Sequence, residues 1–225
     1  MDPYDTEKHV WLVDDGAQQI WKLTHDGKRI VMTLGEHGVA GNDQTHFNRP
    51  TDIVWLPNGE FFVSDGYVNT RVVKFSKDGK YLLEWGKPGK GPGEFNTVHG
   101  IAIDSRRRIY VTDRGNARVQ VFDENGKFLD QWNNIRYPNY IYMSKDQHVW
   151  IGDASTSKIV KYDLNGKLLF SWGTFGAFAG GIWSTHQFSV DSENNLYVAD
   201  VRMARVQKFR PKPGANPDQL VEGDR

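Results

Sequence analysis

Four short runs of β-branched and aromatic residues lie within residues 46–86, and they constrain the fold more than any other feature of this sequence. Clusters of Gly, Pro, Asn and Asp separate the runs, which indicates consecutive strands joined by tight turns. The last turn contains Asp78-Gly79, a pair that tolerates the positive φ of a type I′ hairpin turn. The segment therefore predicts one four-stranded antiparallel sheet, with strands at 51–55, 61–65, 71–76 and 81–85.

The same pattern recurs along the rest of the chain. Similar runs precede the segment within 10–34 and follow it within 99–132, 139–172 and 186–209, and the turn Asp/Asn-Gly-Lys occurs four times. A four-stranded unit repeated about every 40 to 50 residues is typical of a β-propeller, whose blades stack around a central channel. A β-sandwich is the competing all-β fold, but it does not predict this self-similarity. We therefore predict an all-β protein, a β-propeller of four-stranded blades.

The repeat spacing also predicts where the blades begin and end. In three blades the aspartate that ends the second strand lies 14 residues after the residue that opens the first strand. Applied to Asp14, this spacing places the corresponding residue before Met1, so the first blade lacks its inner strand, and the last blade lacks its outer strand. We expect about five blades of a six-bladed ring, within a longer chain. The propeller is expected at 1–211, with blades at approximately 7–35, 46–86, 95–132, 135–173 and 181–211, and a tail containing Pro and Gly at 212–225.

The composition argues against several classes of protein. Lys plus Arg and Asp plus Glu are both 28, so no basic surplus favours nucleic acid or an anionic membrane surface. The chain has no cysteine, which excludes disulfides and thiolate metal sites. No apolar run approaches the ~18 residues of a membrane span. The start, MDPYDTEKHVW, lacks the features of a signal peptide, and the compartment stays open.

The repeat position at the start of each inner strand is a candidate site. Its residues are Asp52, His99, Asn139 and His186. Equivalent positions of inner strands lie at one height around the channel, so we expect these side chains to line it and converge. Two imidazoles near a carboxylate and an amide suit zinc or another divalent metal. The alternative is a polar channel mouth in which each histidine bonds to water or to a carbonyl. The other five histidines are expected at surface or structural positions: His9, His25, His37, His46 and His148.

The turn after the second strand of the 46–86 blade is one residue longer than its counterparts. Six positions separate Asp65 from Arg71, whereas five separate the equivalent residues of three other blades. The longer turn carries Tyr67. We expect the recurrent basic residue to pair with nearby carbonyls and carboxylates. In the next blade Arg114 directly follows the strand-ending aspartate, and the fold does not require a cation there.

These residues carry a resemblance to a known family. The repeats resemble NHL repeats, and the motifs HF at 46–47, PTD at 50–52 and SDGY at 64–67 resemble the lyase domain of peptidylglycine α-amidating enzymes. The similarity extends over His99 and Arg114 and returns around His186. It implies a six-bladed propeller that cleaves the N–C bond of peptidyl-α-hydroxyglycine and releases an amidated peptide and glyoxylate.

The resemblance also implies roles for particular residues. His99 and His186 match two of three zinc-binding histidines, Tyr67 matches a catalytic tyrosine and Arg114 an active-site arginine. In that chemistry zinc binds the substrate hydroxyl and a tyrosinate removes its proton, and both the metal and the guanidinium favour the phenolate. The third zinc histidine would precede Met1. Gln187 stands where the family has a calcium-associated aspartate, so calcium is not expected.

Two functions of different classes follow. The first is a zinc-dependent lyase that acts on a hydroxylated amide, either a small molecule or a peptide in the central channel, with activity reduced or lost if a third ligand is missing. The alternative is a non-catalytic NHL scaffold that binds a protein, peptide or glycan through its loops. Neither reading favours a nucleic-acid or membrane partner, and self-association is one way to complete the ring. The family is commonly exported.

Overall fold

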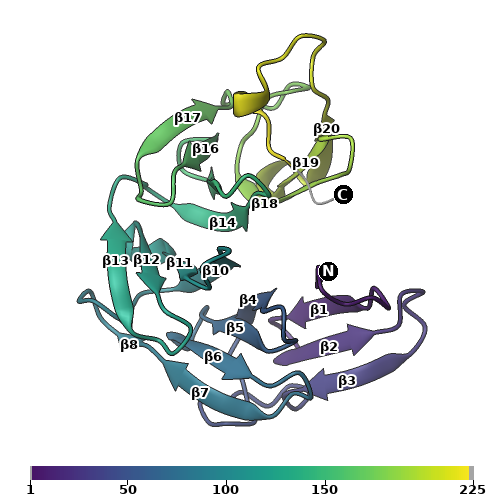
Figure 1. Ribbon diagram of the computed structural model, residues 1–225, viewed down its shortest axis with the longest axis vertical. Helices are drawn as coiled ribbons and strands as arrows, with labels where there is room; N and C mark the ends of the chain where they lie inside the picture. Colours follow the sequence, from purple (N-terminus) through teal and green to yellow (C-terminus); the bar gives the residue numbers. More distant parts are fainter. Residues whose placement is uncertain (1, 223–225) are drawn as a thin grey trace. The chain divides into compact units, whose positions relative to one another are not determined.

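The computed structural model describes residues 2–222, and these form five antiparallel sheets in which neighbouring strands follow one another in the sequence (Figure 1). The first two sheets contain β1 (Val10–Asp14), β2 (Gln19–Leu23) and β3 (Ile30–Leu34), then β4 (Pro50–Trp55), β5 (Phe61–Asp65), β6 (Arg71–Phe75) and β7 (Tyr81–Trp85). The third contains β10 (Val98–Ile103), β11 (Ile109–Asp113), β12 (Arg118–Phe122) and β13 (Phe128–Trp132). The last two contain β14 (Pro138–Met143), β15 (Val149–Asp153), β16 (Lys158–Tyr162) and β17 (Leu168–Trp172), then β18 (Thr185–Val190), β19 (Leu196–Asp200) and β20 (Arg205–Phe209).

The smaller elements lie between or after these sheets. They are the parallel pair β8 (Lys87–Pro88) and β9 (Glu94–Phe95), and the short 3₁₀ helices η1 (Arg114–Asn116), η2 (Val201–Met203) and η3 (Pro217–Gln219). Within residues 2–222, no helix is long and apolar enough to cross a membrane.

The sheets confirm the predicted fold. The protein is all-β and contains five propeller blades, of which the first and last have three strands in the described residues and the other three have four. The Asp-Gly turn forms, but it is not the predicted type I′ turn, because Gly79 has a positive φ and Asp78 does not. Gly79 adopts a left-handed φ of 78°, and the N–H of Ser76 donates to the carbonyl of Lys80 at 2.8 Å. A residue with a Cβ is disfavoured at such a φ, which is why glycine recurs in these turns.

The chain divides into two compact units. The first comprises Met1–Asn116 with Gln120–Asp130, and the second comprises Ala117–Val119 with Gln131–Arg225.

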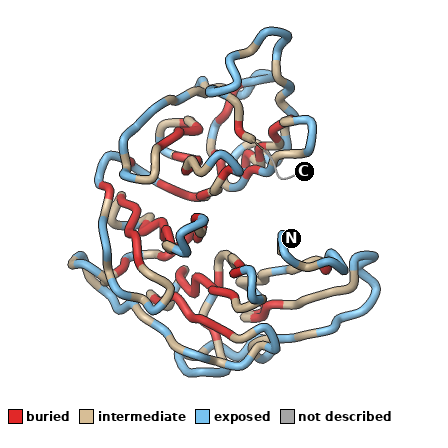
Figure 2. Tube along the Cα trace, in the orientation of Figure 1, coloured by how far each residue is buried: buried red, intermediate tan, exposed pale blue. Residues whose placement is uncertain are grey.

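In the first unit, strand β5 contributes to two hydrophobic cores. Phe61 and Val63 pack in a cluster with Ile20 of the first blade, whereas Phe62 packs in a cluster with Val111 of the third blade. Alternate residues of a strand point to opposite faces of its sheet, so both faces of this blade are covered. All five residues of β5 are buried (Figure 2). Each large apolar side chain buried in this way contributes roughly 1.5–3 kcal/mol.

In the second unit, the segment after β20 packs against the fourth blade. Val221 is buried in the cluster that contains Trp150 and Phe188. The Tyr142 hydroxyl donates to the carbonyl of Glu222 at 3.2 Å. Residues expected to form a tail thus cover part of a hydrophobic core.

The first two strands of four blades pair in the same register, with a β-bulge after the first residue pair. This register corrects the predicted alignment of the repeats. The strand-ending aspartate pairs with the residue that opens the inner strand in each: Pro50 with Asp65, Val98 with Asp113, Pro138 with Asp153 and Thr185 with Asp200. The sequence separation is the same in all four. Thr51, rather than Asp52, therefore occupies the repeat position of His99, Asn139 and His186. The predicted place of Asp52 in the repeat was wrong, because the spacing of 14 residues that holds in the other three blades leads from Asp65 to Thr51.

Candidate functional site

Gly66 allows the turn between β5 and β6 to lie directly against β10. A Cβ built on this glycine would overlap the carbonyl oxygen of Val98 and lie 2.5 Å from the Val98 side chain. Such contacts cannot be relieved by a rotamer change, because the backbone itself is involved. The close approach places the next residue, Tyr67, beside His99, which follows Val98.

Three residues predicted for the site meet in the first unit. The Tyr67 hydroxyl lies 2.9 Å from Nε2 of His99, and the two rings meet edge to face with centroids 5.2 Å apart. The guanidinium carbon of Arg114 lies 5.1 Å from the centroid of the Tyr67 ring. His99 is buried at 4% exposure, whereas Tyr67 and Arg114 are half-buried. A phenol in contact with an imidazole and a guanidinium can hold and transfer a proton.

A second arginine contacts the same ring and was missed by the sequence analysis. The guanidinium carbon of Arg49 lies 4.9 Å from the centroid of Tyr67. Arg49 stands just before the PTD motif, but it belongs to no repeated spacing. Its contact with Tyr67 depends on the tertiary packing of two turns.

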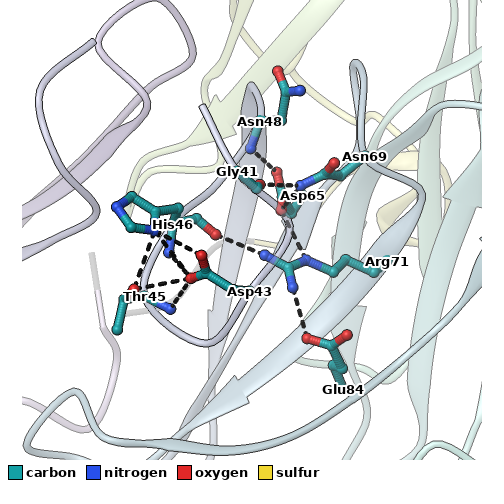
Figure 3. Close-up of polar contacts among 9 residues, drawn as sticks. All are labelled: Gly41, Asp43, Thr45, His46, Asn48, Asp65, Asn69, Arg71 and Glu84. Carbon is teal, nitrogen blue, oxygen red and sulfur yellow. Dashed lines mark hydrogen bonds and ion pairs between the residues drawn. The ribbon is translucent and has the colours of Figure 1, made fainter. Parts of the chain in front are cut away.

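A buried network joins the two ends of the longer turn, Asp65 and Arg71 (Figure 3). The Asp65 carboxylate accepts hydrogen bonds from the Asn48 N–H at 2.9 Å, from Asn69 Nδ2 at 2.7 Å and from Arg71 Nε at 2.9 Å. Arg71 also donates to Glu84 at 2.7 Å and to the carbonyl of His46 at 2.7 Å. The recurrent basic residue of this blade thus binds carboxylates and a carbonyl, as predicted.

The electrostatics of the network follow from its burial. The side chains of Asp65 and Arg71 are 0% and 4% exposed. Loss of solvent raises the pKa of Asp65 from its ordinary value, although Asn69 and Arg71 both act in the opposite direction. Breaking a buried pair of this kind leaves an uncompensated charge and is costly.

Asp52 lies in the same unit but at a different position from the one predicted. It pairs with Ser64, and its carboxylate accepts the N–H groups of Ile53 at 2.9 Å and of Ile101 at 3.1 Å. Desolvation raises its pKa to about 7, against the effect of these two donors. Asp52 therefore links the second blade to the third, and its contribution to a channel stays a prediction.

In the second unit, Asn139 and His186 lie on β14 and β18, at the bulges of neighbouring strands. Asn139 is buried, and its Nδ2 donates to the carbonyl of Thr185 at 2.9 Å. In the first unit Thr51 Oγ1 makes the equivalent bond to the carbonyl of Val98 at 3.1 Å. In both units the side chain at the repeat position, Thr51 or Asn139, thus binds a backbone carbonyl of the next blade. That carbonyl belongs to the residue just before His99 or His186.

The zinc site stays a prediction. Among residues 2–222, no group of three or more His, Asp, Glu or Cys side chains is arranged to hold a metal ion. His99 and His186 belong to different units, and Nε2 of His99 faces the Tyr67 hydroxyl. Four other histidines bind nearby residues, as expected for structural or surface positions, and His37 is exposed: His9 binds Asp5, His25 the carbonyl of Lys8, His46 Asp43 and His148 Asp146.

Comparison with known proteins supports the fold and the resemblance. The family model for the NHL repeat matches residues 95–122, and the model for a 6-bladed β-propeller matches residues 41–108. The solved structure of a streptogramin B lyase superposes with a TM-score of 0.64 at 18% identity, covering 93% of this chain and 67% of that one. At this identity the similarity concerns the fold alone.

The sequence relatives carry more specific names. The peptidylglycine α-amidating monooxygenase of Rattus norvegicus is 38% identical over 130 residues, which are 55% of this chain and 13% of that protein. A probable peptidyl-α-hydroxyglycine α-amidating lyase of Caenorhabditis elegans is 29% identical over 216 residues, which are 92% of this chain and 62% of that protein. The chain thus spans less than two thirds of either relative. The chain is a β-propeller that matches the NHL repeat at residues 95–122 and resembles the peptidyl-α-hydroxyglycine α-amidating lyases in sequence.

Proposed function

We propose that this protein is a lyase that cleaves the N–C bond of an N-acyl-α-hydroxyglycine, with a peptide or a small acyl group on the nitrogen. The observation that carries the proposal is the contact of the Tyr67 hydroxyl with His99 at 2.9 Å, beside the guanidinium of Arg114. These residues match the site residues implied by the resemblance. The relatives named as amidating lyases support the same reaction class.

Tyr67 is the proposed base. As phenolate it takes the proton of the substrate hydroxyl, and the oxygen electrons form the carbonyl of glyoxylate. The N–C bond breaks, its electron pair moves to the nitrogen, and that nitrogen takes the proton from Tyr67, which gives the primary amide and restores the phenolate. His99 holds the phenol oxygen in place through its Nε2, and the Arg114 cation favours negative charge on Tyr67 and on the substrate carboxylate.

No step is derived through a metal, because the described residues supply no three-ligand cluster. Zinc binding by His99 and His186 is a separate proposal. Metal analysis of protein purified without chelators tests it, and His99→Ala and His186→Ala should each lower the zinc content. Calcium is not part of the proposal.

The activity is tested with an N-acyl-α-hydroxyglycine, with amide and glyoxylate quantified against the spontaneous reaction in buffer. Tyr67→Phe should reduce the enzymatic rate by about 10²-fold or more, the scale of a lost general base. Tyr137→Phe is the matched control, because Tyr137 is 42% exposed and belongs to the other unit. Wild-type protein that does not exceed the buffer rate, or Tyr67→Phe with full activity, would contradict the proposal.

A second function is favoured by the segment between β17 and β18. Phe175, Phe178 and Trp183 are 60%, 59% and 43% exposed, and the rings of Phe175 and Trp183 are in contact. Exposed apolar groups gathered in one loop suit the binding of a protein or peptide. This scaffold function predicts that binding survives His99→Ala and His186→Ala and is lost in Phe175→Ser/Phe178→Ser, as measured by calorimetry with a candidate partner.

A further inference from the structure

Arg49 is connected to Tyr67 through both its side chain and its backbone. Its guanidinium carbon lies 4.9 Å from the ring centroid, within the range of a cation–π contact. Its carbonyl accepts the N–H of Tyr67 at 3.2 Å. Arg49 thus contacts both ends of the residue proposed as the base.

The first blade holds Arg49 in this position. Asp15 accepts hydrogen bonds from Nε of Arg49 at 2.8 Å and from its Nη2, and Gln18 Oε1 accepts the Arg49 N–H at 2.6 Å. Asp15 and Gln18 lie in the turn between β1 and β2. Arg49 has a left-handed φ of 64°, which is unfavourable for a residue with a Cβ, and these bonds oppose its relaxation.

The pairing with Asp15 determines which effect Arg49 has on the Tyr67 ring. A guanidinium with two hydrogen bonds to one carboxylate is fixed in orientation and largely neutralised. Its main effect on the neighbouring ring is therefore to restrict its rotation. The Tyr67 ring needs such support, because it projects from a turn that is one residue longer than in the other blades.

We propose that Arg49 is a positioning residue for Tyr67, and that the turn of the first blade, through Asp15 and Gln18, sets the direction of the phenol toward His99. The positioning rests on the contacts above, and only its catalytic consequence rests on the proposed function. Displacement of a catalytic group by about 1 Å can cost about 10²-fold in rate. We expect Arg49→Met to lower kcat by about 10-fold with little change in KM, because Arg49 is paired with Asp15 rather than with substrate.

The experiment has a readout that does not depend on activity. In protein with ¹³C-labelled tyrosine rings, the Tyr67 signal is identified by its absence in Tyr67→Phe. Arg49→Met and Asp15→Asn should both shift and broaden this signal, and Arg49→Lys should have a smaller effect, because lysine keeps the cation but not the two-pronged contact.

Arg107→Met is the matched control. Arg107 also has a φ of 64° and binds a carboxylate, that of Glu124, at 2.8 Å, and its side chain is 46% exposed compared with 49% for Arg49. The control should leave the Tyr67 signal unchanged. An unchanged signal in Arg49→Met, or an equal change in Arg107→Met, would overturn the proposal. If the signal responds and the wild type has no lyase activity, the proposed function fails and the positioning stands.

Discussion

The turn between β5 and β6 in the second blade differs from the turn between β15 and β16 in the fourth, although both begin at a buried aspartate. Asp153 accepts the backbone N–H groups of Arg136 at 3.1 Å and Tyr137 at 3.2 Å, and the hydroxyl of Ser155 at 2.9 Å. The basic residue of that blade, Lys158, donates to a single carbonyl, that of Gly173. A short turn is fixed there by backbone groups and one hydroxyl.

The second blade surrounds its aspartate with side chains. Asn69 and Arg71 both donate hydrogen bonds to Asp65, and Arg71 also donates one to Glu84 (Figure 3). The fourth blade shows that a blade closes without such a network. The third blade has a similar network on a turn of ordinary length, in which Asn116 and Gln120 both bind Asp113, so such a network is not specific to the longer turn that carries Tyr67.

Hydrogen bonding identifies the additional residue of that turn. In the fourth blade Ala154, which directly follows the aspartate, donates its N–H to Tyr137. In the second blade Tyr67 makes the equivalent bond to Arg49, one residue later. Gly66 is thus the insertion, and it moves an aromatic residue to the place of a small one.

The largest expected effect is on the free energy of unfolding, when the basic residues of the two turns, Arg71 and Lys158, are replaced. Arg71→Met should lower the free energy of unfolding by about 3–5 kcal/mol, because it leaves the Asp65 carboxylate buried without its cation. Lys158→Met removes one hydrogen bond and should cost about 1 kcal/mol. Urea unfolding of both variants measures the difference, and equal costs would show that the two turns are equally supported.

The next effect on stability is expected when the inserted residue, Gly66, is replaced. Gly66→Ala should cost about 1–3 kcal/mol, because its methyl group would overlap the Val98 carbonyl, and it should also displace Tyr67 and reduce lyase activity. Gly16→Ala is the control in the first blade, where the nearest atom to the added carbon is Asp14 Oδ1 at 3.4 Å. We expect the control to stay within about 0.5 kcal/mol of wild type in the same unfolding measurement.

A third effect depends on pH and concerns Asp52, whose register position is occupied by Tyr140 in the fourth blade. The pKa of Asp52 is raised to about 7 from 3.8, so the folded protein holds this proton more tightly than the unfolded chain. The resulting stability is complete below about pH 4 and is lost as the pH rises toward 7.

Asp52→Asn removes this titration. The stability of wild type relative to Asp52→Asn should fall by on the order of 2 kcal/mol between pH 4.5 and pH 8. Unfolding curves of both proteins at the two pH values measure the change. A difference that is constant or grows with pH would mean that the N–H groups of Ile53 and Ile101 outweigh desolvation.

The strands could be predicted to within a residue or two because their signals are local. Alternation of apolar residues and Asp-Gly turns fixed β5 and β7 at their observed bounds. The β8–β9 pair escaped prediction, because its two-residue strands carry no periodicity. The packing of Val221 was also missed, since a Pro- and Gly-containing segment gives no sign of which core it covers.

The site residues likewise divide into those that could be predicted from the sequence and those that could not. Tyr67, His99 and Arg114 could be found from departures from the repeat and from a family resemblance. Arg49 could not, because its contact with Tyr67 joins the turns of two blades and follows no spacing. Asp52 was assigned to the wrong repeat position, although the spacing of 14 residues found in the other blades leads from Asp65 to Thr51, as the strand register confirms.

The sequence by itself determined the repeat, the turns, the blades and the identity of three residues at the site. These follow from periodicity and backbone preferences that act over a few residues. The tertiary structure decided that Gly66 brings Tyr67 against His99 and that the first blade holds Arg49 over the phenol. Such contacts join residues far apart in the chain, and they depend on packing geometry at the scale of single atoms.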